Sequence, residues 1–440
     1  MTAIWIAPLL LLPLVGAPLL MRPAFGRLGA AARVVLAGAV GAVLVSFVMT
    51  LCSLAGVAWS IPVLAAGATV LAWGLSHTSA FAGASAAPRG ARGGPVAILA
   101  AVASAGAVVA AALATRLGAA TSPDLFFFWG TKAQRFAAAG RVDVAYLTAP
   151  FHGFLHPYYP PLVTDLGVFA SMAASRFSWD GAMATFPLLL AALAVGLPGT
   201  LDGGRDRVAA ASALAVSAIS LGGIRASIAG NADPPLVFFE ALAIAVLTRR
   251  DAGEPATQWL GGLLLAGAAS SQVEGLPFAV AASALALRHE GARPTVRAAA
   301  RLLGPTAAML GAWFAFGLSR CLFHEYSEYG PFSEVHLDHL GAVLAAVSRA
   351  LGETARGLPW IVPALALAAG GRIPRTARLP LGAAAALVAF LLFAYLHLAS
   401  DPTLWIRWSA PRVLLPVAAM FSLAVAVDPL SARTTRSGLP

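Results

Sequence analysis

One acidic residue, Asp124, lies at the start of a short amphipathic segment in a chain that carries few charges. The segment, residues 122–133, combines a carboxylate with aromatic residues and Lys132. A carboxylate beside a cation can accept a proton from a hydroxyl group, which is general-base chemistry. The structural alternative is that the aspartate is stabilised in the first helical turn by the helix dipole.

The residues around Asp124 predict a helix that lies in a membrane interface. Ser122 followed by Pro123 is typical of a helix start, with serine as the N-cap and proline in the first turn. Residues spaced by about four positions then share one face of the helix. This expected polar face holds Asp124, Phe128, Lys132 and Arg135. Aromatic residues elsewhere on the segment favour a position at headgroup level.

A second aromatic segment contains His156 and Tyr159 and leads into the next apolar run. It reads His-Pro-Tyr-Tyr-Pro-Pro over residues 156–161. Histidine titrates near neutral pH and can transfer protons, and the prolines stiffen the approach to the following helix. From composition alone, the preferred interpretation is an aromatic anchor at the membrane interface.

Two further acids interrupt apolar runs, namely Asp233 and Glu274. Asp233 opens a span in the sequence Gly-Asn-Ala-Asp-Pro-Pro, where either Asn231 or Asp233 can cap the helix or serve as a second site acid. Glu274 follows Gln272 inside the apolar stretch 259–287. An ionisable group at that depth is costly and usually faces a cavity or a partner. A simple turn is the competing explanation.

Two arginines near the end of the chain, Arg407 and Arg412, are candidate anion ligands. They precede the last apolar run together with Asp401, Trp405 and Trp408. A guanidinium group can bind phosphate oxygens through two hydrogen bonds. The alternative is that the two side chains snorkel to lipid headgroups.

The composition defines the class of protein that must position these side chains. Hydrophobic residues make up 59% of the 440 residues and charged residues 11%, with a mean hydropathy of +0.81. Soluble domains carry about 25% charged residues. Repeated apolar runs of about 20 residues can each cross a bilayer core. We therefore predict an all-α, polytopic transmembrane bundle, one domain over residues 1–440.

About 11–13 crossings are expected, with a broken helix or hairpin around residues 271–274. The predicted spans are 3–21, 34–54, 57–76, 95–115, 161–178, 182–200, 208–226, 232–248, 257–270, 275–289, 298–318, 358–370, 380–399 and 411–427. The first is expected to be a retained helix, because the arginines follow it and no basic region precedes it.

The positions of the arginines predict the orientation of the bundle. The net charge of +10 comes from arginines in short connectors, which indicates positive-inside bias and contact with membrane lipids, and not nucleic-acid binding. The connectors near residues 22–33, 89–92, 249–250, 288–301, 372–378 and 433–436 are then cytoplasmic. Segments 116–160, 319–340 and 400–410 are external. The Arg205/Arg207 connector fits only if one of the spans between 161 and 200 fails to cross.

Neither cysteine chemistry nor a cofactor is expected. Cys52 and Cys321 have no metal-like spacing and predict no disulfide framework. The polar segment 324–339 contains histidines and acids, but their spacing matches no ligand pattern. No metal site is predicted, and a divalent cation has no motif to support it.

An ordered series of short motifs resembles bacterial GT-C membrane glycosyltransferases, the group similar to lipid A aminoarabinose transferases and protein O-mannosyltransferases. The series covers residues 120–425. It consists of Asp124-xxxx-Trp129-Gly130-x-Lys132-Ala133, His156-Pro157-x-Tyr159-Pro160, Gly230-x-Ala232-Asp233-x-Pro235-Leu236, Glu274-Gly275-Leu276, and Trp405 through Arg412-Val413-Leu414-Leu415-Pro416.

The resemblance implies transfer of a sugar from a polyprenyl-phosphate carrier to a lipid or glycan acceptor. The reaction would take place at the external, periplasmic face of a bacterial inner membrane. Asp124 matches the base or acceptor-orienting group, with Asp233 as a second acid. Lys132 and Arg412 match positions that hold the departing phosphate, and Arg407 is a weaker match.

Two departures from the pattern leave other functions open. Tyr158 occupies a slot that is often acidic, and Gln272 replaces a lysine that is usual two residues before the glutamate. One alternative is a transporter or flippase for a lipid-linked or anionic substrate, although no internal repeat is visible. Another is a non-catalytic subunit that retains the fold.

Overall fold

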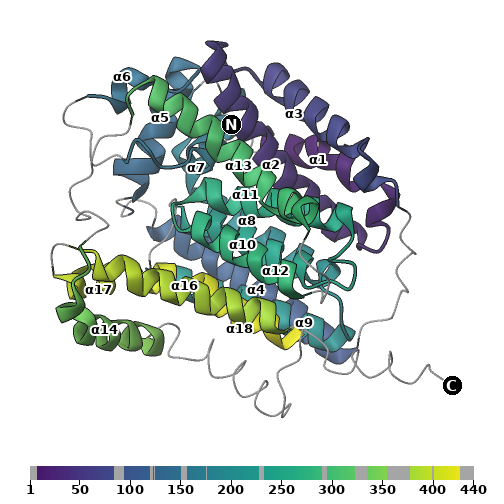
Figure 1. Ribbon diagram of the computed structural model, residues 1–440, viewed down its shortest axis with the longest axis vertical. Helices are drawn as coiled ribbons and strands as arrows, with labels where there is room; N and C mark the ends of the chain where they lie inside the picture. Colours follow the sequence, from purple (N-terminus) through teal and green to yellow (C-terminus); the bar gives the residue numbers. More distant parts are fainter. Residues whose placement is uncertain are drawn as a thin grey trace.

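A computed structural model describes residues 7–83, 94–118, 122, 124–149, 156–174, 176–226, 232–289, 295–322, 334–353, 377–398 and 401–426. These residues form an all-helical bundle, in which no β-strand occurs within the described ranges (Figure 1). The predicted fold class is therefore confirmed.

The helices follow the apolar runs closely. The larger ones are α1 (Leu12–Leu20), α2 (Ala30–Ala55), α3 (Ile61–Ser76), α4 (Pro95–Gly118), α5 (Gly130–Ala139), α6 (Val144–Leu147), α7 (Leu162–Ser171), α8 (Trp179–Thr200), α9 (Arg205–Ala226), α10 (Asp233–Leu247), α11 (Pro255–Ser271), α12 (Gly275–His289), α13 (Val296–Ser319), α14 (Leu340–Glu353), α16 (Arg378–Leu396), α17 (Pro402–Val413) and α18 (Leu415–Ala426). The predicted span 358–370 lies outside the described residues.

Among the described residues, seven helices are long and apolar enough to cross a membrane. They are Ala30–Ala55, Pro95–Leu117, Trp179–Thr200, Arg205–Ile224, Val296–Ser319, Arg378–Leu396 and Pro402–Val425. Shorter apolar helices accompany them, so the count of 11–13 crossings stays a prediction. The length and apolar character of these helices make the chain a multi-span integral membrane protein.

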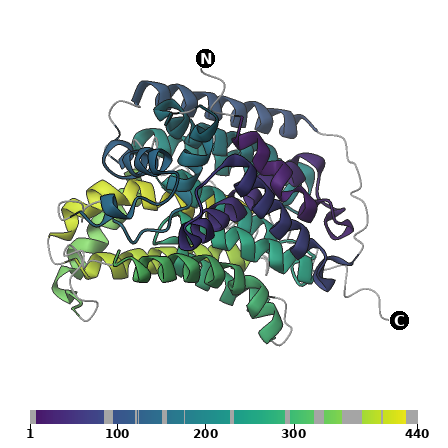
Figure 2. The same ribbon diagram turned by 90° about the horizontal axis from the view of Figure 1, so that it is seen from above.

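Helix α10 is the centre of the bundle. Every residue from Asp233 to Leu247 is buried, and α8, α11, α12 and α18 pack around the helix (Figure 1). Helix α4, by contrast, runs along one outer edge of the bundle and exposes apolar side chains such as Leu99 and Val102 (Figure 2). A helix that is apolar all round needs either protein or lipid neighbours, so the exposed side of α4 is suited to lipid.

Described connectors that were predicted to be cytoplasmic lie at one end of the bundle, whereas residues 89–92, 290–294, 372–376 and 433–436 lie outside the described residues. The end of α8 meets the start of α2, where a Cβ atom on Gly199 would lie 3.0 Å from the Ala32 side chain. Beside them, Arg249 donates a hydrogen bond to the Thr200 carbonyl oxygen over 2.9 Å and Arg301 donates to Gln258 over 3.1 Å. The described arginine-bearing connectors, around residues 22–33, 249–250 and 295–301, thus share one end of the molecule, which we call the arginine end.

The opposite end holds the segments that were predicted to be external. Helices α5 and α6 lie at the upper left of Figure 1, and α14 and α17 lie at its lower left. Trp313, near the end of α13, donates to the Tyr158 carbonyl oxygen over 3.0 Å, and the His336 backbone N–H donates to the Leu396 carbonyl oxygen over 2.8 Å. We call this the site end.

The short length of α7 explains why the Arg205/Arg207 connector lies at the arginine end. Helix α7 has 10 residues and covers about 15 Å, half the thickness of a bilayer core. It starts at the site end and is too short to cross, whereas the 22-residue α8 is long enough. The connector after α8 consequently lies at the arginine end, as the positive-inside pattern requires.

The interruption at residues 271–274 forms a hairpin. Helix α11 ends at Ser271, Gln272 is extended with φ −158° and ψ 163°, and α12 starts at Gly275. A Cβ atom on Gly275 would lie 2.0 Å from the Ala268 carbonyl oxygen, so the close turn requires glycine. The two helices pack against each other and bring Glu274 to the site end.

Candidate functional site: an arginine–carboxylate cluster

Asp124 is positioned by a helix start that the sequence predicts correctly. The Ser122 hydroxyl group accepts a hydrogen bond from the Leu125 backbone N–H over 3.3 Å. The first turn, Asp124–Trp129, is π-helical and continues directly into α5. A Cβ atom on Gly130 would lie 2.5 Å from both the Leu125 carbonyl oxygen and the Trp179 ring, so only glycine fits at this junction. Short π-helical turns are frequent at functional sites.

Arg412 links Asp124 to Asp233, although these residues come from three distant parts of the chain. The Arg412 guanidinium donates a hydrogen bond to the Asp124 carboxylate, and the same nitrogen lies 4.0 Å from an oxygen of Asp233. About a quarter of the Asp124 and Arg412 side chains is exposed, but only 3% of Asp233. A substrate at the site end can therefore reach the first pair, with Asp233 beneath it.

Helix α17 holds Arg412 in its last turn. The Asp401 side chain caps the start of α17 by accepting a hydrogen bond from the Thr403 backbone N–H over 2.8 Å. The Tyr395 hydroxyl group lies 2.7 Å from the Ser409 hydroxyl group and ties α16 to α17. Arg412 is thus fixed at the site end by two helices.

Asp233 does not cap its own helix. Ala232 occupies the N-cap position without a side-chain bond, and Asp233 is the first residue of α10. Asn231, the other candidate cap, lies outside the described residues. With Pro234 and Pro235 behind it, the Asp233 side chain faces Arg412, which favours the interpretation as a site acid over that of a cap.

Two glutamates extend the cluster into the bundle. Glu274, at the α11–α12 turn, interacts electrostatically with Asp233 and Arg412. Glu240, two turns along α10 from Asp233, is 0% exposed and interacts with Glu274 and Asp233. Neither oxygen of Glu240 has a hydrogen-bond partner in the part of the chain that the structure describes. We call Asp124, Asp233, Glu240, Glu274 and Arg412 the arginine–carboxylate cluster.

Sequence reasoning missed Glu240, and it missed Asp165 in α7 as well. Asp165 is buried and accepts a hydrogen bond from the Ser46 hydroxyl group of α2 over 2.7 Å. Both acids lie alone in apolar runs, and that isolation is the signal that identifies them.

Lys132, His156 and Tyr159 form a separate group, which we call the lysine–aromatic cluster. The Lys132 amine lies 4.4 Å from the centre of the Trp129 ring, and His156 stacks on Tyr159 with ring centroids 4.4 Å apart. Lys132 is 4% exposed, against the expectation of a mobile cation beside Asp124. It is also the only lysine among the 440 residues.

Burial dominates the electrostatics of the lysine–aromatic cluster. Loss of hydration lowers the pKa of Lys132 from 10.5 to about 7, because the charged amine is the better solvated form. Burial, followed by the charge of Lys132, lowers the pKa of His156 to about 4. His156 is therefore neutral at pH 7 and suited to hydrogen bonding and stacking.

The structure does not bring Arg407 or Arg135 to the arginine–carboxylate cluster. Arg407 is exposed and, five residues before Arg412, points about 140° away around α17. Arg135 forms an ion pair with Asp143 at 3.0 Å on the surface, so the expected polar face of the segment is not kept. The π-helical turn shifts the register by which these residues were aligned. Within the described ranges, no group of three His, Cys, Asp or Glu side chains is arranged to hold a metal ion.

The arginine–carboxylate cluster combines a partly exposed carboxylate with a fixed cation at one end of the helical bundle. Such a pair can accept a proton from a hydroxyl group and can stabilise an anion that develops nearby. No family model, curated protein or solved structure matches this chain. The fold and the arrangement of the cluster thus define a multi-span, all-helical integral membrane protein.

Proposed function

We propose that the protein is a glycosyltransferase that moves a sugar from a polyprenyl-phosphate donor to an acceptor hydroxyl group at the external membrane surface. One observation carries the proposal: Asp124, Asp233 and Arg412, from three distant segments, meet at one end of the bundle. The order of motifs in the sequence supports the same activity.

In this proposal Asp124 orients the acceptor hydroxyl group and accepts its proton. Arg412 neutralises the phosphate oxygen that leaves with the polyprenyl chain, because a preplaced guanidinium stabilises developing negative charge. The active face is the site end, and the isoprenoid tail of the donor lies in lipid beside the bundle.

The lysine–aromatic cluster is suited to the donor sugar and its phosphate. The rings of Trp129, His156 and Tyr159 offer flat apolar faces, and the Lys132 amine supplies a cation close to them. An anion bound beside Lys132 would favour its protonated form. This cluster would therefore contribute to binding, whereas Asp124 and Arg412 act on the reacting atoms.

A proton-coupled transporter of an anionic substrate is the second candidate. It is favoured by the buried carboxylates Glu240 and Asp165 and by the interrupted pair α11–α12, since intramembrane acids often mark proton or substrate pathways. Proteoliposomes that accumulate a labelled lipid phosphate inside, without forming glycan product, would favour transport.

Transfer from a labelled polyprenyl-phosphate sugar tests the proposal. Purified protein in lipid nanodiscs is incubated with a panel of such donors and candidate acceptors. We expect Asp124→Asn to lower product formation by about 10²–10⁴-fold, with normal expression and folding. The matched control is Asp338→Asn, the same change on an acid of the site end that is 76% exposed. Equal product from Asp124→Asn and the wild type would contradict the assignment, and absence of product with every donor would favour transport or a non-catalytic role.

A further inference from the structure

Glu240 stands out because its environment offers nothing that stabilises a negative charge. It lies in the middle of α10, and its side chain is 0% exposed. Neither carboxyl oxygen has a hydrogen-bond partner within the described ranges. A buried, unpartnered carboxylate costs several kcal/mol or more, so such a group takes up a proton or pairs with a cation.

The charged neighbours of Glu240 are acids. The helices packed against α10 are α8, α11, α12 and α18. Charged groups that interact with Glu240 are Glu274, at the turn before α12, and Asp233, on α10 itself. Arg412 lies 4.0 Å from Asp233 and is hydrogen-bonded to Asp124. Within the described residues, the cluster therefore combines one guanidinium with four carboxyl groups.

This imbalance couples the cluster to any anion that binds at Arg412. An incoming phosphate adds negative charge close to Asp233 and Glu274, and like charges repel strongly in a medium of low dielectric constant. A proton taken from solvent by one of the buried carboxylates removes that repulsion.

We propose that Glu240 and Glu274 form a proton-binding carboxyl pair, and that the pair takes up one proton from solvent when an anionic phosphate binds at Arg412. The identity of the anion rests on the proposed function. The proton balance is simple: one carboxylate becomes a carboxylic acid, and one negative charge arrives with the phosphate. Phosphate affinity rises as pH falls, by up to about tenfold per pH unit where a full proton is taken up.

Infrared difference spectroscopy tests this pair directly. Purified protein in nanodiscs receives farnesyl phosphate, whose binding is measured separately with a radiolabelled sample. We expect binding to increase the C=O band of a protonated carboxyl group in the wild type. The double variant Glu240→Gln/Glu274→Gln keeps both shapes but leaves no titrating carboxyl group in the pair, and it should lose that band. The matched control Glu254→Gln changes an exposed glutamate at the arginine end and should keep it.

The outcomes separate this inference from the proposed function. Binding of farnesyl phosphate without a new carboxyl band, or with an equal band in the double variant, would overturn the carboxyl pair and leave the proposed function standing. Absence of binding would count against the proposed function. In that case a pH titration of the same band without lipid decides on the pair: loss of the titrating band in the double variant supports it, and an unchanged titration overturns it.

Discussion

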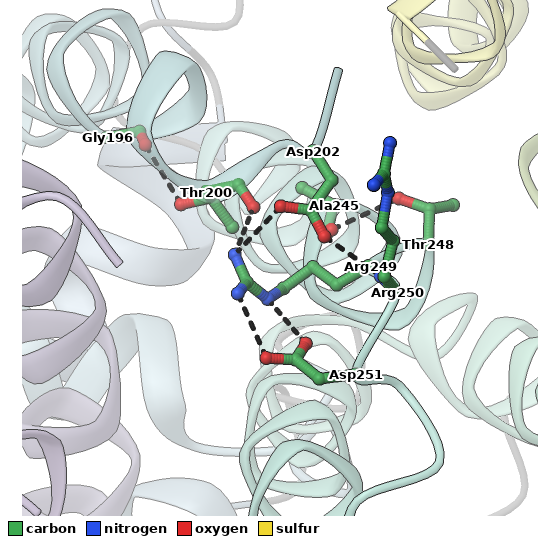
Figure 3. Close-up of polar contacts among 8 residues, drawn as sticks. All are labelled: Gly196, Thr200, Asp202, Ala245, Thr248, Arg249, Arg250 and Asp251. Atoms are coloured by element: carbon green, nitrogen blue, oxygen red, sulfur yellow. Dashed lines mark hydrogen bonds and ion pairs between the residues drawn. The ribbon is translucent and has the colours of Figure 1, made fainter. Parts of the chain in front are cut away.

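Arg249 and Arg412 lie near opposite ends of α10, and each meets two aspartates, yet their surroundings differ. Arg249 forms a two-pronged ion pair with Asp251, with N–O distances of 2.8 and 3.1 Å, and also donates to the Thr200 carbonyl oxygen (Figure 3). Asp202, 3.8 Å from Arg249, accepts a hydrogen bond from the Arg250 backbone N–H. The Arg249 guanidinium and the carboxylates of Asp251 and Asp202 therefore all have hydrogen-bond partners.

The polar groups around Arg412, in contrast, do not all have hydrogen-bond partners within the described residues. Its Nε atom, Glu240 and one oxygen of Glu274 have no hydrogen-bond partner in the part of the chain that the structure describes. Unsatisfied buried polar groups are costly, and native proteins keep them where function requires it. Arg249, whose guanidinium nitrogens all donate hydrogen bonds, therefore joins two connectors. Arg412, whose Nε atom has no hydrogen-bond partner within the described residues, is available to a substrate.

Removal of each arginine should affect stability very differently. Arg249→Ala leaves Asp251 buried without its cation, so we expect the free energy of unfolding to fall by about 3–5 kcal/mol. Arg412→Ala should cost less, because the carboxyl groups around it can take up protons. Thermal unfolding of both variants in the same detergent measures the difference. An equal or larger loss at Arg412 would break the comparison.

Replacement of Glu240 by an apolar residue should stabilise the protein. Glu240→Met fills a similar volume and removes a buried polar group that has no partner, which is worth about 1–3 kcal/mol. The measurement is the midpoint of chemical unfolding. Glu254→Met, an exposed position at the arginine end, should change the stability by less than about 0.5 kcal/mol. A destabilised Glu240→Met variant would indicate that the carboxyl group is satisfied in the folded protein.

Titration of Lys132 should reveal its burial. Because its pKa is lowered from 10.5 to about 7, the unfolded chain binds more protons than the folded chain between these values. Stability therefore rises with pH across this window, and Lys132→Met should remove that rise. Since the 440 residues contain one lysine, ¹³C-methylation followed by NMR gives an assigned lysine signal. A midpoint near 10.5 would place the amine in water.

Much of the fold was predictable because a membrane span can be identified from the length and the apolar character of a run of residues. The α11–α12 interruption, the Ser122 cap and the gathering of arginine connectors at one end all follow from local residue chemistry. The end of α7 was not identified: the predicted span 161–178 continued through Arg176, whereas the helix ends at Ser171.

The site was predictable only in part. Asp124, Asp233, Glu274 and Arg412 were identified as polar residues that interrupt apolar sequence, and they meet in space. Lys132 was expected beside Asp124; the structure shows it buried over the Trp129 ring, after a π-helical turn that changes the helical register. Glu240 was missed because a single acid within an apolar run was not considered as a candidate site residue.

The convergence of Asp124 and Arg412 is the central claim, and cross-linking tests it most directly. In a chain with Cys52→Ala and Cys321→Ser, cysteines replace Asp124 and Arg412, and a short bismaleimide is added to the protein in membranes. The account predicts a cross-linked pair of peptides that are 288 residues apart in sequence. The control pair, cysteines in place of Asp124 and Arg250, should remain unlinked. Failure of positions 124 and 412 to link, with both cysteines reactive toward a monomaleimide, would contradict the account.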